Sequence, residues 1–108
     1  MSSLFKFRKY KKEEGNKHNR SKHPKLIVEE DEKFFGFMGL TESRKSGHRA
    51  NIPLIKNPKK NDKRPAYIRK ELRRDVKENF EEILNDYNLS NKDLNNILDF
   101  LEKYKKKK

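Results

Sequence analysis

The chain has 108 residues, of which 43% are charged and 31% hydrophobic, and its formal net charge is +12. Globular domains carry roughly 25% charged residues, so a core can form here only where the apolar residues are concentrated. The length leaves room for one small domain, the lack of cysteine excludes disulfides and thiolate metal sites, and no apolar run has the ~18 residues of a membrane-spanning helix.

The first 24 residues are predicted to be a flexible, disordered basic arm. Residues 1–25 contain nine basic and two acidic side chains, and Gly15 and Pro24 interrupt a segment without periodicity. Such a segment buries too little apolar surface to offset its ordering entropy. Only the alternation in LFKFRKY leaves a short pairing strand open.

A β-hairpin is predicted next. Residues 25–30 (KLIVEE) and 33–41 (ending FFGFMGLT) are apolar or aromatic and flank a polar turn. Gly36 and Gly39 within the second strand indicate a bulge or a close approach by another backbone or a ligand.

Two further strands are predicted beyond a basic loop. Residues 51–56 (NIPLIK) indicate a third strand, and Pro53 restricts it to an edge or a bulge because proline cannot donate to a ladder. Residues 66–72 (AYIRKEL) alternate and favour a fourth strand, although they are also compatible with the start of a helix.

A helical hairpin is predicted for the C-terminal third. Apolar residues in 75–87 recur at helical spacing, and those in 91–104 follow an i, i+3, i+4, i+7 pattern after an N-cap signature at Ser90. The predicted class is therefore α+β: a small antiparallel sheet of three to four strands and a C-terminal helical hairpin form a single domain over 25–104. The arm 1–24 precedes this domain, and the lysine tail 105–108 follows it.

Basic side chains are concentrated in residues 41–74, where twelve basic and three acidic residues give a net charge of +9. Repeated long cations on loops and strand ends suit phosphate contacts and counterion release. We therefore predict a non-catalytic nucleic-acid-binding protein, for RNA or DNA, that uses this basic surface together with the basic arm and needs no cofactor or metal. The predicted binding residues are Arg44, Lys45, Arg49, Lys56, Lys59, Lys60, Lys63, Arg64, Arg69 and Arg73. A solvated, solubilising surface is the alternative reading of the same charges.

Aromatic residues beside this basic region are candidates for base stacking, although a chain this polar also needs them for its core. They are Phe34, Phe35, Phe37 and Tyr67.

A metal-independent endoribonuclease is the first alternative function. His48 would act as the base and Arg44 and Arg49 would stabilise the developing phosphorane charge. The stretches FFGFMGL and NIPLIKNPKK, about a quarter of the chain, resemble the central strands of the small barrel endoribonuclease toxins of type III toxin–antitoxin systems. The resemblance implies RNA cleavage, but no residue role is taken from it.

A protein-interaction module is the second alternative. The apolar face of residues 91–104 would then bind a partner helix or a second copy of the chain. The charged N-terminus has no apolar run typical of a secretion signal, so we expect a cytoplasmic protein without a membrane partner. Frequent Lys, Asn and Ile are also typical of genes on mobile elements.

Overall fold

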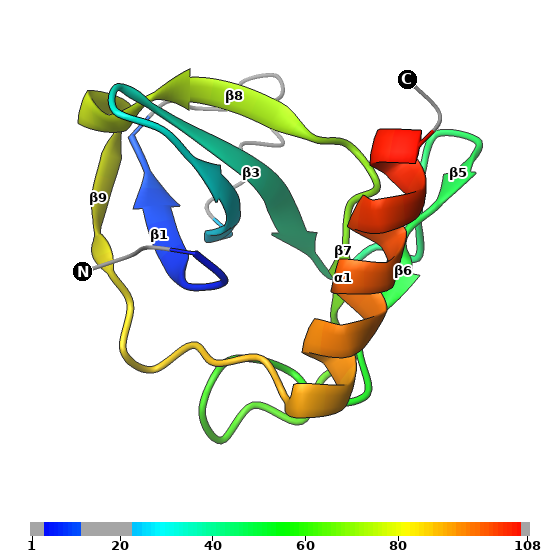
Figure 1. The fold of residues 1–108 in the computed structure, drawn as a ribbon. Coiled ribbons are helices and arrows are strands. Elements are labelled where there is room, and N and C mark those ends of the chain that lie inside the picture. The colour runs from blue at the N-terminus through cyan, green and yellow to red at the C-terminus, as the bar shows by residue number, and fades with distance from the viewer. Residues whose placement is uncertain (1–3, 12–22, 107–108) are drawn as a thin grey trace.

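The computed structural model describes residues 4–11 and 23–106, which form one curled antiparallel sheet, a small separate hairpin and one C-terminal helix (Figure 1). The α+β class is therefore confirmed. In chain order the elements are β1 (Phe7–Tyr10), β2 (Lys25–Glu30), β3 (Phe34–Thr41), β4 (Lys45–Ser46), β5 (Arg49–Ala50), β6 (Ile52–Pro53), β7 (Tyr67–Ile68), β8 (Arg73–Val76), the 3₁₀ turn η1 (Lys77–Asn79), β9 (Phe80–Ile83) and α1 (Asn91–Lys106).

The predicted hairpin is confirmed as β2 and β3, at the centre of the sheet. The Asp31 carboxylate closes its turn by accepting the backbone N–H groups of Lys33 (2.9 Å) and Phe34 (2.8 Å). The pairing register shifts between Ile27 and Glu29, where a Cβ on Gly36 would lie 2.7 Å from a Glu29 carboxylate oxygen. The glycine therefore makes room for the irregularity that the sequence indicated.

The sheet curls until its ends approach one another. Along the pairing order β8-β3-β2-β1-β9, the two terminal strands are consecutive in the chain and are joined only by η1. This arrangement gives a small barrel-like shell, and such closure leaves few unpaired strand edges. The short pair β6 and β7 extends the sheet beyond the end of β3. The third and fourth predicted strands are thus present but shorter, and Pro53 lies in the edge strand β6 as expected.

The helix predicted over 75–87 is wrong. These residues continue β8 and then form η1 and β9, so the described chain contains one α-helix and no helical hairpin. β8 pairs with β3 and β9 pairs with β1, and the backbone N–H of Leu84 donates to the carbonyl of Phe7 over 2.9 Å. Long-range pairing of this kind outweighs a helical spacing of apolar residues in the segment itself.

The flexible arm is not confirmed for residues 4–11, where the short pairing strand that the sequence left open is present as β1. β1 lies between β2 and β9, and the Phe7 side chain is completely buried. The remainder of the predicted arm, 1–3 and 12–22, lies outside the described residues. The strand is stable only because two neighbours far along the chain complete its hydrogen bonds, which a local pattern of four residues does not reveal.

Helix α1 covers one face of the sheet. Ile97 and Leu101 enter the larger core cluster, which also contains Phe7, Leu26 and Met38. The N-cap at Ser90 is confirmed, because its hydroxyl accepts the backbone N–H of Asp93 over 3.1 Å.

Asp93 is itself fully buried beneath the first turn of α1. Its carboxylate accepts the backbone N–H groups of Ile55 (2.8 Å) and Lys56 (3.3 Å). The start of the helix is thereby tied to the loop that follows β6.

Candidate nucleic-acid interface

The sheet face opposite α1 carries a second, aromatic core. Phe35, Phe37 and Phe80 pack with Ile27, and their rings meet edge-on at centroid distances of 5.2 Å. Tyr10 borders this cluster, and its hydroxyl donates a hydrogen bond of 2.5 Å to Asp75. Burial, followed by that hydrogen bond, raises the pKa of Tyr10 to about 12, so Tyr10 stays a neutral donor at physiological pH.

Cationic side chains cover this aromatic core. The Arg8 guanidinium carbon lies 5.1 Å from the ring centroid of Phe35, Lys77 Nζ lies 5.2 Å from the same centroid, and the Arg73 guanidinium carbon lies 5.4 Å from that of Phe37. Long basic side chains can shield apolar groups with their stems while their charged heads remain in water. The predicted stacking role is wrong for Phe35 and Phe37, because only 4% and 1% of their surfaces are exposed.

The other two stacking candidates are more accessible. Phe34 is 39% exposed, with the Arg74 guanidinium 5.8 Å from its ring centroid, and Tyr67 is half-buried.

A hollow of about 630 Å³ lies between the β4–β5 hairpin and the segment between β7 and β8. We call it the large hollow, and it is lined by Ser46, His48, Arg49, Asn51, Arg69, Lys70 and Glu71. Among the described residues of this lining, the basic side chains outnumber the single carboxylate.

Local contacts hold the hairpin against this hollow. Gly47 adopts a positive φ of 65°, which a glycine tolerates without strain, and so turns the chain between β4 and β5. The buried Asn51 accepts from the Ser46 hydroxyl (3.1 Å) and donates to the Ser43 carbonyl (2.9 Å). Arg49 Nη1 donates to the carbonyl of Lys70 over 3.1 Å, which joins the two walls.

A second, much smaller hollow adjoins the first and shares Arg69 and Glu71 with it. We call it the small hollow, and it is lined by Lys25, Phe37, Gly39, Arg69, Glu71 and Arg73. Lys25 is only 3% exposed, and burial together with repulsion by Arg69 lowers the pKa of its amine to about 8.

Four of the predicted residues lie around a separate hollow of about 650 Å³, on the loop after β6. They are Lys56, Lys59, Lys60 and Lys63. Arg49 and Arg69 line the large hollow and Arg73 lines the small one, whereas Arg44 and Lys45 are exposed and line neither. His48, the proposed base, does line the large hollow beside Arg49.

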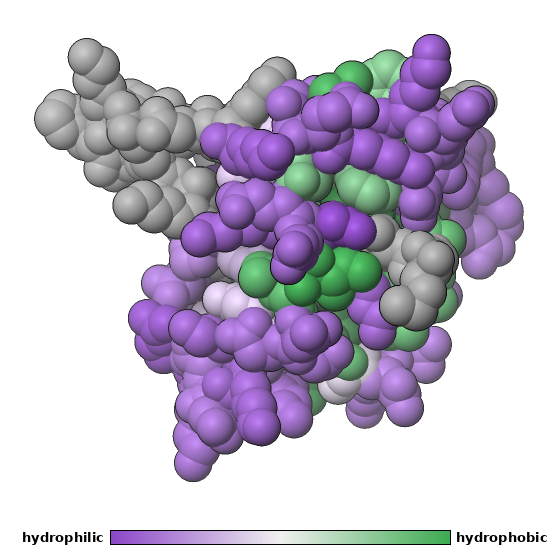
Figure 2. Space-filling view, turned by 90° about the vertical axis from the view of Figure 1, so that its left-hand side faces the viewer, coloured by the Kyte–Doolittle hydropathy of each residue, from purple (hydrophilic) through white to green (hydrophobic). Residues whose placement is uncertain are grey.

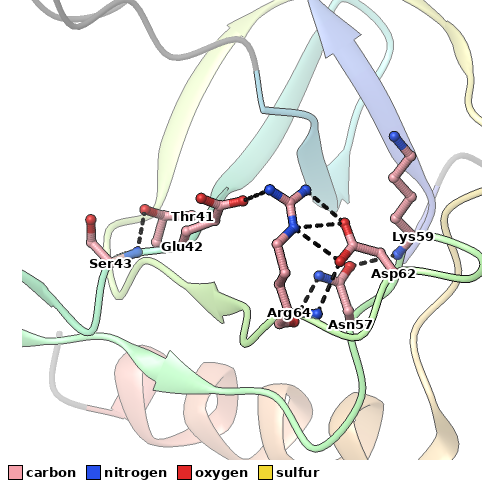
Figure 3. A network of polar contacts seen from close by, with 7 residues as sticks. All are labelled: Thr41, Glu42, Ser43, Asn57, Lys59, Asp62 and Arg64. Atoms are coloured by element: carbon pink, nitrogen blue, oxygen red, sulfur yellow. Dashed lines mark hydrogen bonds and ion pairs between the residues drawn. The ribbon is translucent and has the colours of Figure 1, made fainter.

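The tenth predicted residue, Arg64, is engaged within the protein (Figure 3). Its guanidinium pairs with the carboxylates of Asp62 (2.8 Å) and Glu42 (3.1 Å). Hydrogen bonds from Arg64 lower the pKa of Asp62 to about 2, so this pair persists throughout the physiological range. Asn57 donates to the Arg64 carbonyl over 2.9 Å. Arg64 therefore organises the loop 57–64 and presents less charge to a ligand than the sequence suggested.

Carboxylates of the β2–β3 turn neutralise one end of the cationic cover. Asp31 pairs with Arg74 at 2.9 Å and Glu30 pairs with Lys77 at 3.0 Å. By contrast, eight of the remaining cations form no ion pair with another described residue: Arg44, Lys45, Arg49, Lys56, Lys59, Lys60, Lys63 and Arg69. The positive field is therefore concentrated away from the turn.

The face over β9 has a different character (Figure 2). It is hydrophilic around a small apolar patch, and a hollow over β9 is lined by basic and acidic residues together, among them Arg8, Lys9, Glu81 and Glu82. Mixed signs produce little net attraction for a polyanion.

The apolar face of α1, which the second alternative function assigned to a partner helix or a second copy, packs on the sheet. Ile97 and Leu101 are buried in the larger core, and among the described residues of the helix Leu98 is the large apolar side chain left exposed, at 41%. The sheet has thus taken the place of the expected partner.

Lys25 and the Tyr10–Asp75 pair were missed as site residues. A usable signal exists for Lys25, because it begins the run KLIV, which becomes the buried part of β2, and a cation in such a run usually has a specific partner or role. The pairing of Tyr10 with Asp75 joins residues 65 positions apart and has no local signal.

No protein-family model, curated protein or solved structure matches the chain. Residues 4–11 and 23–106 contain no cluster of His, Cys, Asp or Glu side chains suited to a metal ion. No helix in that part of the chain has the length and apolar character needed to span a bilayer.

Proposed function

We propose that the protein binds nucleic acid, RNA or DNA, through the large hollow and the cations around it. The observation that carries the proposal is that Arg49 on β5 and the neighbouring pair Arg69 and Lys70 between β7 and β8 come from two separate segments and line one hollow. Two of them, Arg49 and Arg69, make no ion pair with a described residue, so no carboxylate of the described chain neutralises the charge that they offer to a ligand.

Binding would proceed through phosphate contacts that release counterions. Each neutralised phosphate contributes about 0.9 to the slope of log affinity against log salt concentration on duplex DNA. Arg49 and Arg69 also provide planar guanidinium groups that can hold a phosphate with two parallel hydrogen bonds. The basic loop of Lys56, Lys59, Lys60 and Lys63 would extend the same attraction along a longer strand.

A salt titration with random-sequence RNA and DNA tests the proposal. We expect micromolar or tighter binding at ~50 mM salt that weakens steeply as salt is added. The variant Arg49→Gln/Arg69→Gln should weaken binding and reduce the salt slope by about two, whereas Lys103→Gln, an exposed position on α1, serves as the matched charge control. Absence of binding at low salt would refute the proposal.

RNA cleavage is a second candidate, supported by the position of His48 beside Arg49, Ser46 and Arg69 in the large hollow. His48 would remove the 2′-hydroxyl proton as the 2′-oxygen attacks phosphorus, and the arginines would stabilise the phosphorane. The bond to the 5′-oxygen would then break, with a proton from the imidazolium or from water passing to that oxygen. Arg69, rather than the predicted Arg44, would then be the second cation. Incubation with RNA in EDTA distinguishes the two candidates: cleavage by the parent protein that is lost in His48→Ala favours an enzyme, and intact RNA that is nevertheless bound favours a binding protein.

A further inference from the structure

We propose that the small hollow binds the doubly charged terminal phosphate of a nucleic acid strand. The inference rests on the proposed function, because the large hollow holds the strand itself. The inference specifies the terminal phosphate as the chemical group by which the protein distinguishes the end of a strand from its interior.

Three cations from different parts of the chain meet in this hollow: Lys25 on β2, Arg69 after β7 and Arg73 on β8. They surround Gly39, where a Cβ would lie 3.7 Å from Lys25 Nζ and 3.4 Å from Arg69 Cδ. Because the glycine has no side chain, the space between the two cations stays open.

The charge of the lining matches a phosphomonoester. Three cations and the carboxylate of Glu71 give the described lining a net charge of +2 when Lys25 is protonated. A terminal phosphate carries close to two negative charges at neutral pH, since its second pKa is about 6, whereas an internal phosphodiester carries one. Arg73 Nε lies 3.8 Å from a Glu71 carboxylate oxygen, so the acid restrains this cation at the edge of the hollow.

The size of the hollow favours the same group. Its volume is about 40 Å³. One water molecule needs roughly 10–15 Å³ on a comparable measure, so the hollow accommodates about three oxygen-sized groups. A terminal phosphate presents three such oxygens, whereas a nucleobase does not fit.

The two hollows are continuous in their lining. Arg69 and Glu71 belong to both, and the large hollow, at about 630 Å³, has room for the nucleoside next to the phosphate. A strand whose end enters the small hollow can therefore extend along the β4–β5 hairpin.

The protonation of Lys25 makes the site sensitive to pH. The charged or titratable groups around it are Arg69, Glu71 and Arg73 in the hollow, Tyr10 with its ring 6.0 Å from the amine, and Arg8 opposite it in the strand register. With a pKa of about 8, the amine is charged at pH 7 and neutral at pH 9.5. Terminal-phosphate recognition should therefore be strongest between about pH 6 and 8, where both the amine and the dianion are charged.

Affinities for one short oligonucleotide with a 5′-phosphate, a 3′-phosphate or hydroxyl groups at both ends test the inference. At pH 7 we expect at least one phosphorylated form to bind about tenfold more tightly than the hydroxyl form, as charge-assisted hydrogen bonds allow. The difference should shrink several-fold at pH 9.5.

Two variants distinguish phosphate binding in the small hollow from non-specific attraction by the positive charge of the protein. Lys25→Met removes the buried charge at nearly constant volume, and Gly39→Ala retains every charge but places a methyl group between Lys25 and Arg69. Gly39 does not adopt a positive φ, so alanine is compatible with its backbone. Both variants should lose the preference for the phosphorylated strand while still binding the hydroxyl form. Lys103→Met, with the same charge change on α1, should keep the preference.

The outcomes distinguish this inference from the function on which it rests. Equal affinities for phosphorylated and hydroxyl strands overturn the terminal-phosphate site and leave nucleic-acid binding intact. Absence of binding by either strand overturns both. Inorganic phosphate is titrated separately: if it saturates the wild-type protein while the strands show no difference, the hollow is a site for free anions and the inference fails.

Discussion

The two faces of the β2–β3 hairpin are covered by different means. On one face, Ile97 and Leu101 of α1 close a core of aliphatic side chains and Phe7. On the other, an aromatic cluster lies beneath Arg8, Arg73 and Lys77, whose charged groups stand 5.1–5.4 Å from the rings. A helix buries a core and presents an ordinary polar surface, whereas a cover of basic side chains buries a core and creates a positive field.

The difference shows how a chain with 31% hydrophobic residues, and one α-helix in its described part, can cover both faces of its central strands: the helix covers one face and basic side chains cover the other. The stems of arginine and lysine contribute apolar area, and their charges are available to a ligand. Clustered cations repel one another, and the carboxylates Glu30 and Asp31 relieve this repulsion near the hairpin turn. At the other end of the cover, Arg73 lines the small hollow and lies 3.8 Å from a Glu71 carboxylate oxygen.

The largest expected effects come from truncating one buried side chain in each cluster, which tests whether both faces of the β2–β3 hairpin carry a tightly packed core. Phe37→Ala should lower the free energy of unfolding by about 3–5 kcal/mol and Ile97→Ala by about 2–5 kcal/mol, since each removes a fully buried side chain and leaves a cavity. Urea denaturation measures both. A loss below about 1 kcal/mol in Phe37→Ala would mean that the basic cover does not exclude water from the aromatic cluster.

Lys25→Met should raise the free energy of unfolding, by less than the two core truncations lower it. Burial lowers the pKa of Lys25 from 10.5 to about 8, so the folded state disfavours its proton. The wild-type protein therefore bears a destabilisation that is fully present below pH 8 and disappears as the pH rises to 10.5. We expect the variant to be more stable by about 1–3 kcal/mol at pH 7.

The pH dependence checks this assignment to Lys25. The stability difference between Lys25→Met and wild type should approach zero above pH 10.5, measured by denaturation at several pH values. A difference independent of pH would attribute the effect to packing rather than to charge.

Substitution of Arg8 tests how much the basic side chains over the aromatic cluster contribute to stability. The Arg8 guanidinium carbon lies over the Phe35 ring, 5.1 Å from the centroid, and its Nη1 donates to the Glu81 carbonyl over 2.7 Å. Arg8→Ala should lower the free energy of unfolding by about 1 kcal/mol, through loss of a cation–π contact and of apolar cover. Arg8→Met retains the stem and should lose roughly half as much. Equal losses in the two variants would assign the stabilisation to the charged head alone.

Arg64→Gln should have the smallest effect of the set. The Arg64 and Glu42 side chains are exposed to solvent while that of Asp62 is less so, and ion pairs with an exposed cation contribute little to stability. The urea midpoint and the affinity for nucleic acid should both stay close to wild type, in contrast to the loss of affinity in Arg49→Gln. A matching loss in Arg64→Gln would show that Arg64 leaves its carboxylates to contact the ligand.

Local patterns were sufficient for the hairpin and for α1. The run KLIV, the Asp31 turn and the aromatic second strand describe β2 and β3 to within a residue, and the Ser90 cap with its apolar spacing describes the helix. Both elements carry their own start, stop and burial signals. The cationic character of residues 41–74 was equally evident from composition.

Other parts of the site depended on contacts that no local pattern contains. Arg49, Arg69 and Lys70 were recognisable as basic residues, but only the fold separates them from Arg64 and places them on one hollow. Lys25 was counted as part of the basic N-terminal charge, and its burial became apparent only from the pairing of β2 between β1 and β3.

The sequence by itself determined the α+β class, the central hairpin, the C-terminal helix and the concentration of positive charge, because each is encoded within a short stretch of chain. Tertiary structure alone decided that residues 75–87 form strand and turn, that Phe7–Tyr10 is a buried strand, and which cations face the hollows. The physical reason is that a β-strand satisfies its backbone hydrogen bonds with distant partners, so its formation depends on neighbours elsewhere in the chain.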